Sequence, residues 1–223
     1  MDNQRADWQD SLEAIVSRQV GGRDGSHDLG HLRRVLKNAY RIADEIGKPV
    51  CRLTLLAAAM LHDIVSVEKD DPRRSQASCL AAVEARRLLE DAQFPQCKLD
   101  GVVHAIEAHS YSAGITTRTV EAMILQDADR LDALGAIGIA RLFYVGGRIG
   151  TALYDADDIL ASKRQLDDLR YSLDHIQTKL LKLPNSMKTE PGRRIANERA
   201  GFIQEFMQRM CQEAGVVARR EEA

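Results

Sequence analysis

The sequence predicts an all-α protein, on the evidence of residue usage and hydrophobic periodicity. Ala and Leu together number 52, whereas Val and Ile together number 27, and this excess of strong helix formers over β-branched residues favours helices. Apolar residues recur at intervals of three and four along most of the chain, as on one face of an α-helix. No alternating strand pattern competes with these segments. We therefore expect one helical domain over residues 1–223.

The predicted helices follow one another through short connections. They cover residues 1–20, 32–46, 53–64, 75–89, 99–109, a stretch from about 119 past 134, 158–182 and 191–212. The second helix ends at Gly47 and Pro49, which stop helices. Gly146 and Gly147 predict a break, and Pro191 suits the first turn of the last helix. Residues 213–223 are expected to form a frayed tail.

The charge balance excludes a protein whose main task is to coat nucleic acid. Lys and Arg number 31 and Asp and Glu number 33, for a net charge of −2, and aromatic residues make up 4%. Binding to a phosphate backbone needs a basic excess or a dense basic face, and binding of single strands relies on aromatic stacking. A single nucleotide in a pocket stays compatible with this composition.

The chain carries no signal for a membrane or for secretion. It has no apolar run of about eighteen residues, and its first residues, MDNQRADWQD, are polar and acidic, unlike a signal peptide. We therefore expect a cytoplasmic protein. Its cysteines are scattered without a CxxC pair and are expected to be reduced core thiols; they are Cys51, Cys79, Cys97 and Cys211.

A His-Asp pair ends the most apolar stretch of the chain. His62 and Asp63 follow the segment AAAML, where apolar packing would be the default. Burying an imidazole and a carboxylate there is costly unless they are paired or bind a metal ion. Such a pair can also simply cap a helix or lie at the surface. The pair therefore indicates a metal site only if other residues point to the same site.

Two further histidines lie one helical turn apart. His27 and His31 in SHDLGHLRRV can share a helix face, and this spacing suits two ligands of one ion. With Asp28 they partly match the HExxH pattern of zinc proteases. Asp28 is one methylene shorter than the Glu of that pattern and no third zinc ligand follows in the usual context, so a metalloprotease is the weaker interpretation.

Carboxylates interrupt a second apolar segment, LQDADRLDALGAIGIAR. Asp129 and Asp132 are three residues apart and share a helix face, whereas Asp127 and Asp129 do not. A solvated face would explain part of this pattern, but the apolar neighbours leave little polar surface. A carboxylate in the interior needs a cationic partner, so we interpret Asp129 as a metal ligand or as the partner of an arginine.

The order His31, His62-Asp63 and Asp129, on three predicted helices, resembles the HD superfamily of metal-dependent phosphohydrolases. Longer strings resemble its YedJ/YpgQ branch over about residues 27–200: HDLGHLRRV, AAAMLHDIVSVEKDDPRRS, HAIEAHSYSAG, LQDADRLDALGAIGIAR, LDHIQTKLLKLP and MKTEPGRRIA. This resemblance implies a helical bundle of the HD-domain type.

The resemblance also implies a metal site and an activity. His31, His62, Asp63 and Asp129 match the four protein ligands of the HD site. Two imidazoles and two carboxylates suit a divalent Mn, Ni, Co, Fe, Zn or Mg ion. Relatives in this branch cleave nucleoside triphosphates between the α and β phosphates, so the implied substrate is a nucleotide, attacked by a metal-activated water.

Other residues have candidate roles in substrate binding. His27 is expected to contact a phosphate, to orient His31, or only to cap its helix. Three basic residues follow the His-Asp pair and could hold the outer phosphates or merely be solvated; they are Lys69, Arg73 and Arg74. His104 and His109 are candidate substrate contacts, although their spacing separates them by about 140° around a helix.

The general base has two candidates. Glu68 lies five residues beyond Asp63, whereas Ser66 occupies the three-residue spacing expected from some HD phosphohydrolases. Asp63, as a ligand that also contacts the metal-bound water, is the simpler candidate.

The same residues are compatible with other functions. The same site could serve a nucleoside monophosphatase or a cyclic phosphodiesterase, or the domain could bind metal and nucleotide without catalysis, as a sensor. The apolar C-terminal helices also make a homodimer plausible.

Overall fold

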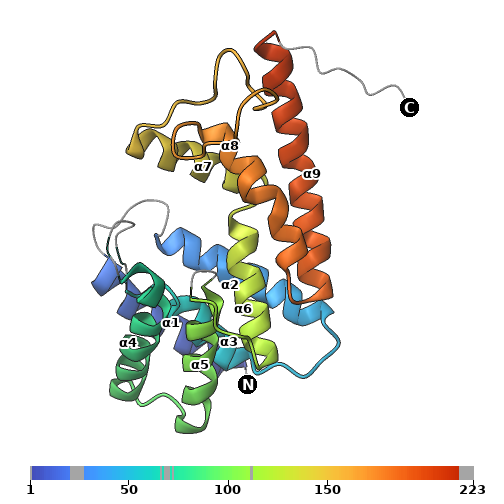
Figure 1. Cartoon of the computed structure of the whole chain (residues 1–223). Helices are drawn as coiled ribbons and strands as arrows, with labels where there is room; N and C mark the ends of the chain where they lie inside the picture. The colour runs from blue at the N-terminus through green and yellow to red at the C-terminus, as the bar shows by residue number, and fades with distance from the viewer. Residues whose placement is uncertain are drawn as a thin grey trace. The chain divides into compact units, whose positions relative to one another are not determined.

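The computed structural model describes residues 2–20, 28–65, 67, 71, 73–110 and 113–215. Within these residues the backbone forms nine α-helices and two 3₁₀-helices and no β-strand (Figure 1), which confirms the all-α prediction. Over the same part of the chain, no helix combines the length and apolar character needed to cross a membrane. The helices are α1 (Asp2–Val20), α2 (Leu29–Glu45), α3 (Arg52–Leu61), η1 (Arg74–Gln76), α4 (Ala77–Asp91), α5 (Gln96–His109), α6 (Val120–Asp132), α7 (Gly135–Ile149), α8 (Ser172–Thr178), η2 (Leu180–Ser186) and α9 (Glu190–Glu213).

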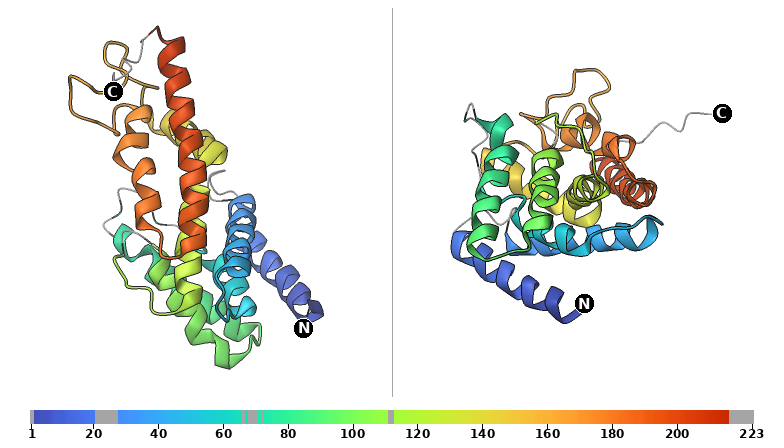
Figure 2. Two further views of the ribbon diagram at one scale, coloured as in Figure 1. Left: turned by 90° about the vertical axis from the view of Figure 1, so that its right-hand side faces the viewer. Right: turned by 90° about the horizontal axis from the view of Figure 1, so that it is seen from below.

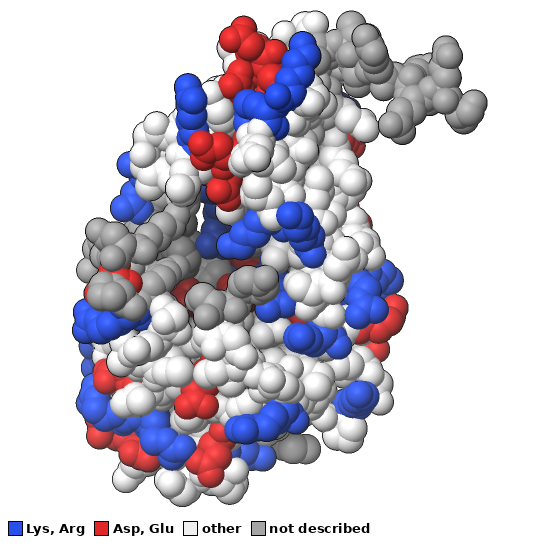
Figure 3. Space-filling model, viewed as in Figure 1, with Lys and Arg blue, Asp and Glu red and all other residues white. Residues whose placement is uncertain are grey.

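The chain divides into two compact units. Unit 1 consists of residues 1–129 and 188–192, and unit 2 consists of residues 130–187 and 193–223. The expectation of one domain over residues 1–223 stays a prediction, because compact units form within single domains as well as across two. Over the face drawn in Figure 3, acidic and basic side chains are interspersed, in keeping with the near-zero net charge.

Unit 1 is built around α3. Every residue from Thr54 to Leu61 is buried, because α1, α2, α4 and α5 all contact this helix. A helix buried on all sides must be apolar all round, which explains the sequence LTLLAAAML. The helix ends at Leu61, earlier than the predicted residue 64, so His62 and Asp63 stand in the turn that follows it.

α2 packs one face against α3 and exposes the other. The buried face repeats at helical spacing and contains His31, Leu32, Val35, Leu36, Asn38, Ala39, Ile42 and Ala43. α1 contacts both α2 and α3 and is the dark blue helix in Figure 2. The two polar residues on the buried face of α2, His31 and Asn38, are seven residues apart and therefore lie on the same side of the helix, two turns apart.

The helix boundaries around residues 133–150 differ from the prediction. α6 stops at Asp132, and α7 begins at Gly135, whose φ of +70° is a conformation that favours glycine. The predicted break at Gly146 and Gly147 is wrong, because α7 continues through both residues. At position 146 a Cβ would lie 2.2 Å from the Ser172 Oγ, so this glycine permits close packing of α7 and α8 rather than a break.

The predicted helix over residues 158–182 is also largely wrong. α8 begins only at Ser172, and the preceding segment is irregular. Its aspartates accept hydrogen bonds from nearby backbone amides: Asp155 from Asp157 and Asp158, and Asp158 from Ser162 and Lys163. Such local bonds compete with the helical ladder, and helical spacing of apolar residues does not reveal them.

A buried carboxylate in unit 1 holds the start of α9. Asp127 is completely buried. It accepts hydrogen bonds from the Lys188 amide at 2.8 Å, the Thr189 amide at 2.8 Å and the Thr189 hydroxyl at 2.7 Å. At residue 192 a Cβ would lie 2.5 Å from the Asp127 Oδ2, so Gly192 leaves room for the carboxylate. Asp127 is therefore a structural residue.

Replacing this carboxylate should destabilise the protein strongly. We expect Asp127→Ala to lower the free energy of unfolding by about 3 kcal/mol, because it leaves buried donors without their acceptor. Denaturant unfolding of chelator-treated protein measures the change, and the exposed Asp157→Ala provides a control that should shift it by less than about 0.5 kcal/mol. Equal stability of the two variants would contradict the structural role of Asp127.

Candidate metal site

Four predicted ligands from three helices meet in unit 1. His31 lies in the first turn of α2, His62 and Asp63 follow α3, and Asp129 lies near the end of α6. The His31 Nε2 and His62 Nε2 atoms are 3.3 Å apart. The Asp63 Oδ2 atom is 3.6 Å from each of these nitrogens, and the Asp129 Oδ1 atom is 3.6 Å from His31 and 3.8 Å from His62.

These separations fit donors arranged around one cation. Two donor atoms that each lie about 2.1 Å from an ion are about 3.0–3.4 Å apart at octahedral or tetrahedral angles. The donor atoms of His31, His62 and Asp63 all lie within 4.8 Å of one another. Two nitrogen and two hard oxygen donors suit a first-row divalent metal. The residues present therefore fit a divalent ion.

The chain is similar to curated and solved proteins. Residues 28–134 match the family profile of the HD domain. The curated Bacillus subtilis YpgQ, described as an uncharacterized protein, is 30% identical over 203 residues, which cover 89% of this chain and 88% of YpgQ. The chain belongs to the HD-domain family.

Solved structures that are similar to this chain agree with this assignment. One is Bacillus subtilis YpgQ in complex with ADP, with a TM-score of 0.71, 28% identity and coverage of 92% of this chain and 97% of that chain. Another is an HD-superfamily hydrolase from Bacillus thuringiensis, with a TM-score of 0.72, 28% identity and coverage of 96% and 100%. These relatives support a metal-dependent hydrolase in general.

Within the HD site, the two histidines are buried and the carboxylates reach solvent. The His31 and His62 side chains are 1% and 0% exposed, whereas those of Asp63 and Asp129 are each 31% exposed. The Nδ1 of His62 lies 2.9 Å from the Ala59 carbonyl oxygen, so this nitrogen donates a hydrogen bond to the carbonyl and Nε2 faces the cluster. A cation or a substrate would therefore approach from the carboxylate side.

Charge pairing dominates the protonation of this cluster when no metal is bound. Burial disfavours the charged form of Asp63, but His62, His31 and His109 outweigh it and hold its pKa well below the ordinary value. Burial likewise opposes ionisation of Asp129, yet a hydrogen bond from His62 and the nearby imidazoles lower its pKa. Burial lowers the pKa of His62, and Asp63 and Asp129 outweigh that effect, so the result is a raised pKa.

Asn38 supports the site and was not among the predicted residues. Its side-chain amide donates a hydrogen bond of 3.3 Å to the Ala128 carbonyl oxygen, which ties α2 to α6 one residue before Asp129. Asn38 lies two turns beyond His31 on the buried face of α2. A polar residue at a buried position of an amphipathic helix is the signal that could have revealed it.

His109 joins the edge of the site. Its ring lies against His62 with a centroid distance of 4.9 Å, and its Nε2 is 3.8 Å from the Asp63 Oδ1. The Nδ1 of His109 lies 2.6 Å from the Ile106 carbonyl oxygen, so Nε2 points toward the carboxylate. Burial and the neighbouring His62 lower the pKa of His109, which favours the neutral imidazole.

His104 makes a different contact. Its Nε2 accepts a hydrogen bond from the Arg118 amide at 2.9 Å, and burial together with Arg118 lowers its pKa. This bond gives a structural reason for the buried position of His104. Substrate contact by His104 stays a prediction.

The remaining predicted residues lie on or beside segments that are only partly described. His27, Glu68 and Lys69 fall outside the described residues. Arg73 is exposed and pairs with Asp71 at 2.8 Å, and Arg74 begins η1. A phosphate would bind to the guanidinium N–H groups that Asp71 does not use, or would displace that carboxylate.

The other carboxylates of the α6 segment have protein partners. The buried Asp132 accepts a hydrogen bond of 2.6 Å from Arg141 within unit 2. Asp127 holds Lys188 and Thr189 in unit 1. Of the three aspartates in this segment, Asp129 is thus the one that faces the two imidazoles.

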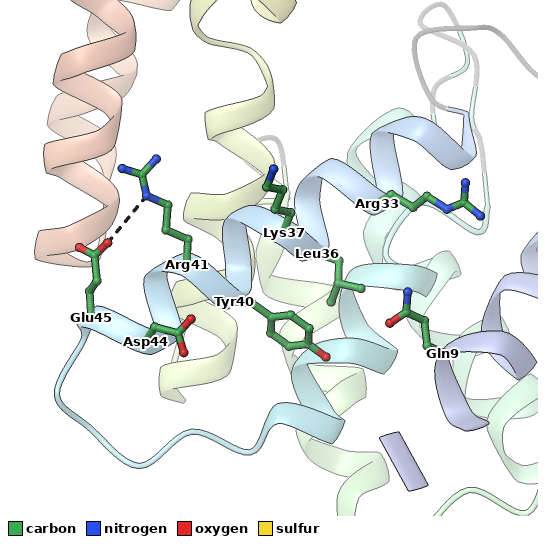
Figure 4. A pocket seen from close by; sticks show the side chains of 8 residues that line it. All are labelled: Gln9, Arg33, Leu36, Lys37, Tyr40, Arg41, Asp44 and Glu45. Carbon is green, nitrogen blue, oxygen red and sulfur yellow. Dashed lines mark ion pairs between the residues drawn. The ribbon is translucent and has the colours of Figure 1, made fainter. Parts of the chain in front are cut away.

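A groove on unit 1 lies away from these ligands. It encloses about 580 Å³ and is lined by residues from α1 and α2 (Figure 4), namely Gln9, Arg33, Leu36, Lys37, Tyr40, Arg41, Asp44 and Glu45. None of the predicted site residues lines it. The groove therefore does not contribute to the HD site.

Removal of one ligand should abolish tight metal binding. We expect His62→Ala and Asp129→Asn each to weaken Mn²⁺ binding at least 100-fold. The first removes a nitrogen donor, and the second replaces an anionic carboxylate donor by a neutral amide. Titration calorimetry on chelator-treated protein measures this change. His175→Ala, which alters a histidine of unit 2, is the matched control, and a similar loss in that variant would argue against the assigned ligands.

In the metal-free protein, the contribution of His62 to stability should fall as the pH rises. A raised folded-state pKa for His62 contributes stability that is complete below the ordinary value of 6.5 and is lost as the pH rises through the folded value. The lowered pKa of His109 acts in the opposite direction. Denaturant unfolding of the wild type and of His62→Asn from pH 6 to 9 measures this contribution. We expect the difference between their free energies of unfolding to shrink toward high pH. A difference that grows with pH would contradict this assignment.

Proposed function

We propose that this HD-domain protein is a metal-dependent phosphohydrolase that converts nucleoside triphosphates into monophosphates and pyrophosphate. The observation that carries the proposal is the convergence of two imidazoles and two carboxylates, with the carboxylates open to solvent. The structure of YpgQ in complex with ADP supports a nucleotide as the substrate class. The strings shared with the pyrophosphohydrolase branch favour cleavage between the α and β phosphates.

The four ligands would hold a divalent ion, for which Mn, Ni, Co, Fe, Zn and Mg are the candidates. When bound, such an ion lowers the pKa of a coordinated water and neutralises charge on the attacked phosphoryl group. His62 would present its Nε2 to this ion, because its Nδ1 is bonded to the Ala59 carbonyl oxygen. Both imidazoles are buried, whereas both carboxylates are partly exposed. Water would therefore reach the ion from the side of Asp63 and Asp129.

Two carboxylates are candidates for moving the proton of the attacking water. The Asp63 Oδ2 atom lies 3.6 Å from the Nε2 atoms of both ligand histidines. A water held at the site would therefore be close enough to donate a hydrogen bond to this carboxylate. Glu68 follows it by five residues in the sequence. Glu68→Gln tests the second candidate, because loss of the base alters the acid limb of the pH–rate profile, whereas Asp63→Asn would also change a metal ligand.

Basic and neutral donors are proposed to bind the substrate. Lys69, Arg73 and Arg74 supply cations close in sequence to Asp63 and would pair with the β and γ phosphates. His27 would contact a phosphate or orient His31. His109 would contact the substrate or its leaving group as a hydrogen-bond acceptor through the Nε2 that faces Asp63, because in the neutral ring Nδ1 carries the proton that bonds to the Ile106 carbonyl.

Product analysis tests the reaction. Purified protein with Mn²⁺, Ni²⁺, Co²⁺ or Mg²⁺ should convert triphosphates into equal amounts of monophosphate and pyrophosphate, measured by ³¹P NMR. His62→Ala and Asp129→Asn should lower kcat/KM by about 1000-fold, since the ion contributes several kcal/mol to catalysis, while His175→Ala should keep the wild-type rate.

Other products would redirect the assignment. Release of orthophosphate from triphosphates, or turnover of only monophosphates or cyclic nucleotides, would replace pyrophosphohydrolysis by phosphatase or phosphodiesterase activity. Nucleotide binding with no turnover under any metal would favour a sensor.

A further inference from the structure

His31 occupies the least supported part of its helix. α2 begins at Leu29, so this ligand is the third residue of the helix. The amides of a first helical turn have no acceptors within the helix and need outside partners. A ligand in such a turn moves with the turn whenever it opens.

Asp28 supplies the missing acceptor directly to the ligand. Its backbone is extended, with φ −88° and ψ −179°, as an N-cap residue requires. Its Oδ1 accepts a hydrogen bond from the His31 amide at 2.9 Å, and its carbonyl accepts one from the Leu32 amide at 3.3 Å. The capping bond therefore ends on the residue whose side chain faces Asp63 and Asp129.

Gly30 makes the first turn more dependent on this cap. A Cβ at residue 30 would lie 3.0 Å from the Asp28 Oδ1 and 3.3 Å from an Arg34 Nη1, so the absence of a side chain leaves room for the carboxylate. Glycine also costs about 1 kcal/mol in a helix relative to alanine. Gly30 thus leaves room for the Asp28 carboxylate, but as a glycine it also destabilises the first turn, so the turn depends more on the cap.

The ligands are supported in different ways. For His62 the ring itself is held by a carbonyl of the preceding turn, on a helix end that is buried in unit 1. For His31 the main chain is held by an exposed carboxylate. A change at residue 28 can therefore act on the ligand without disturbing the core.

We infer that Asp28 is a positioning residue of the metal site, which holds His31 in place for the cation through the bond to its amide. The inference rests on the proposed metal binding. It assigns the carboxylate between His27 and His31 to the helix cap and not to proton transfer.

Three variants test this role in the full chain. Asp28→Ala removes the cap, and Asp28→Asn keeps it, because asparagine caps as well as aspartate. Thr119→Ala is the matched control: its hydroxyl accepts a bond from the Ala122 amide at 3.2 Å at the start of α6, ten residues before Asp129. Titration calorimetry with Mn²⁺ gives the affinity, and hydrogen exchange of the metal-free protein reports the protection of the His31 amide.

We expect Asp28→Ala to bind Mn²⁺ about tenfold more weakly, as for other outer partners of ligands, and to lose protection at His31. Asp28→Asn should retain both, and Thr119→Ala should retain the affinity despite a similar loss of stability. Wild-type affinity in Asp28→Ala would overturn the inference, and so would an Asp28→Asn as weak as Asp28→Ala, which would assign the effect to charge. If the wild type binds no metal while all variants fold, the proposed function itself is wrong, and not only the role of Asp28 in positioning His31.

Discussion

The burial of α3 is the constraint on which the rest of unit 1 depends. Four helices contact α3, so it is apolar on all sides, and the chain leaves it through His62 and Asp63. An imidazole and a carboxylate at the end of such a helix would be costly if isolated. They are stable because His31 and Asp129 meet them from α2 and α6. Core packing and the candidate chemistry are therefore parts of the same arrangement.

Groups that are not ligands hold the ligands in place. The Ala59 carbonyl orients His62, the Asn38 amide ties α2 to α6 beside Asp129, and the Asp28 carboxylate caps the turn of His31. Each of these bonds uses a backbone group close to a ligand, so it sets the position of the main chain as well as of the side chain. Supporting bonds of this kind reduce the reorganisation that metal binding would otherwise need.

Sequence patterns predicted some elements better than others for identifiable reasons. α2 and α9 carry strong helical spacing and appear close to their expected bounds. The segment before α8 has apolar residues at similar spacing, yet Asp155 and Asp158 bind local amides and prevent a helix. Gly146 suggested a break, but close packing against Ser172 explains it instead. Periodicity reports which side of a segment is apolar, and it does not report these competing local and tertiary contacts.

Residue usage, apolar periodicity and motif order were enough to predict the all-α class, the HD-type resemblance and the four residues that meet at the site. They were enough because helix propensity, apolar periodicity and motif order are local properties of the chain. Only the tertiary structure decided that His109 faces Asp63 while His104 binds Arg118, that Asp127 is structural, and that Asn38 and Asp28 support the ligands. These distinctions depend on which groups come within hydrogen-bonding distance after helices far apart in the sequence have packed together.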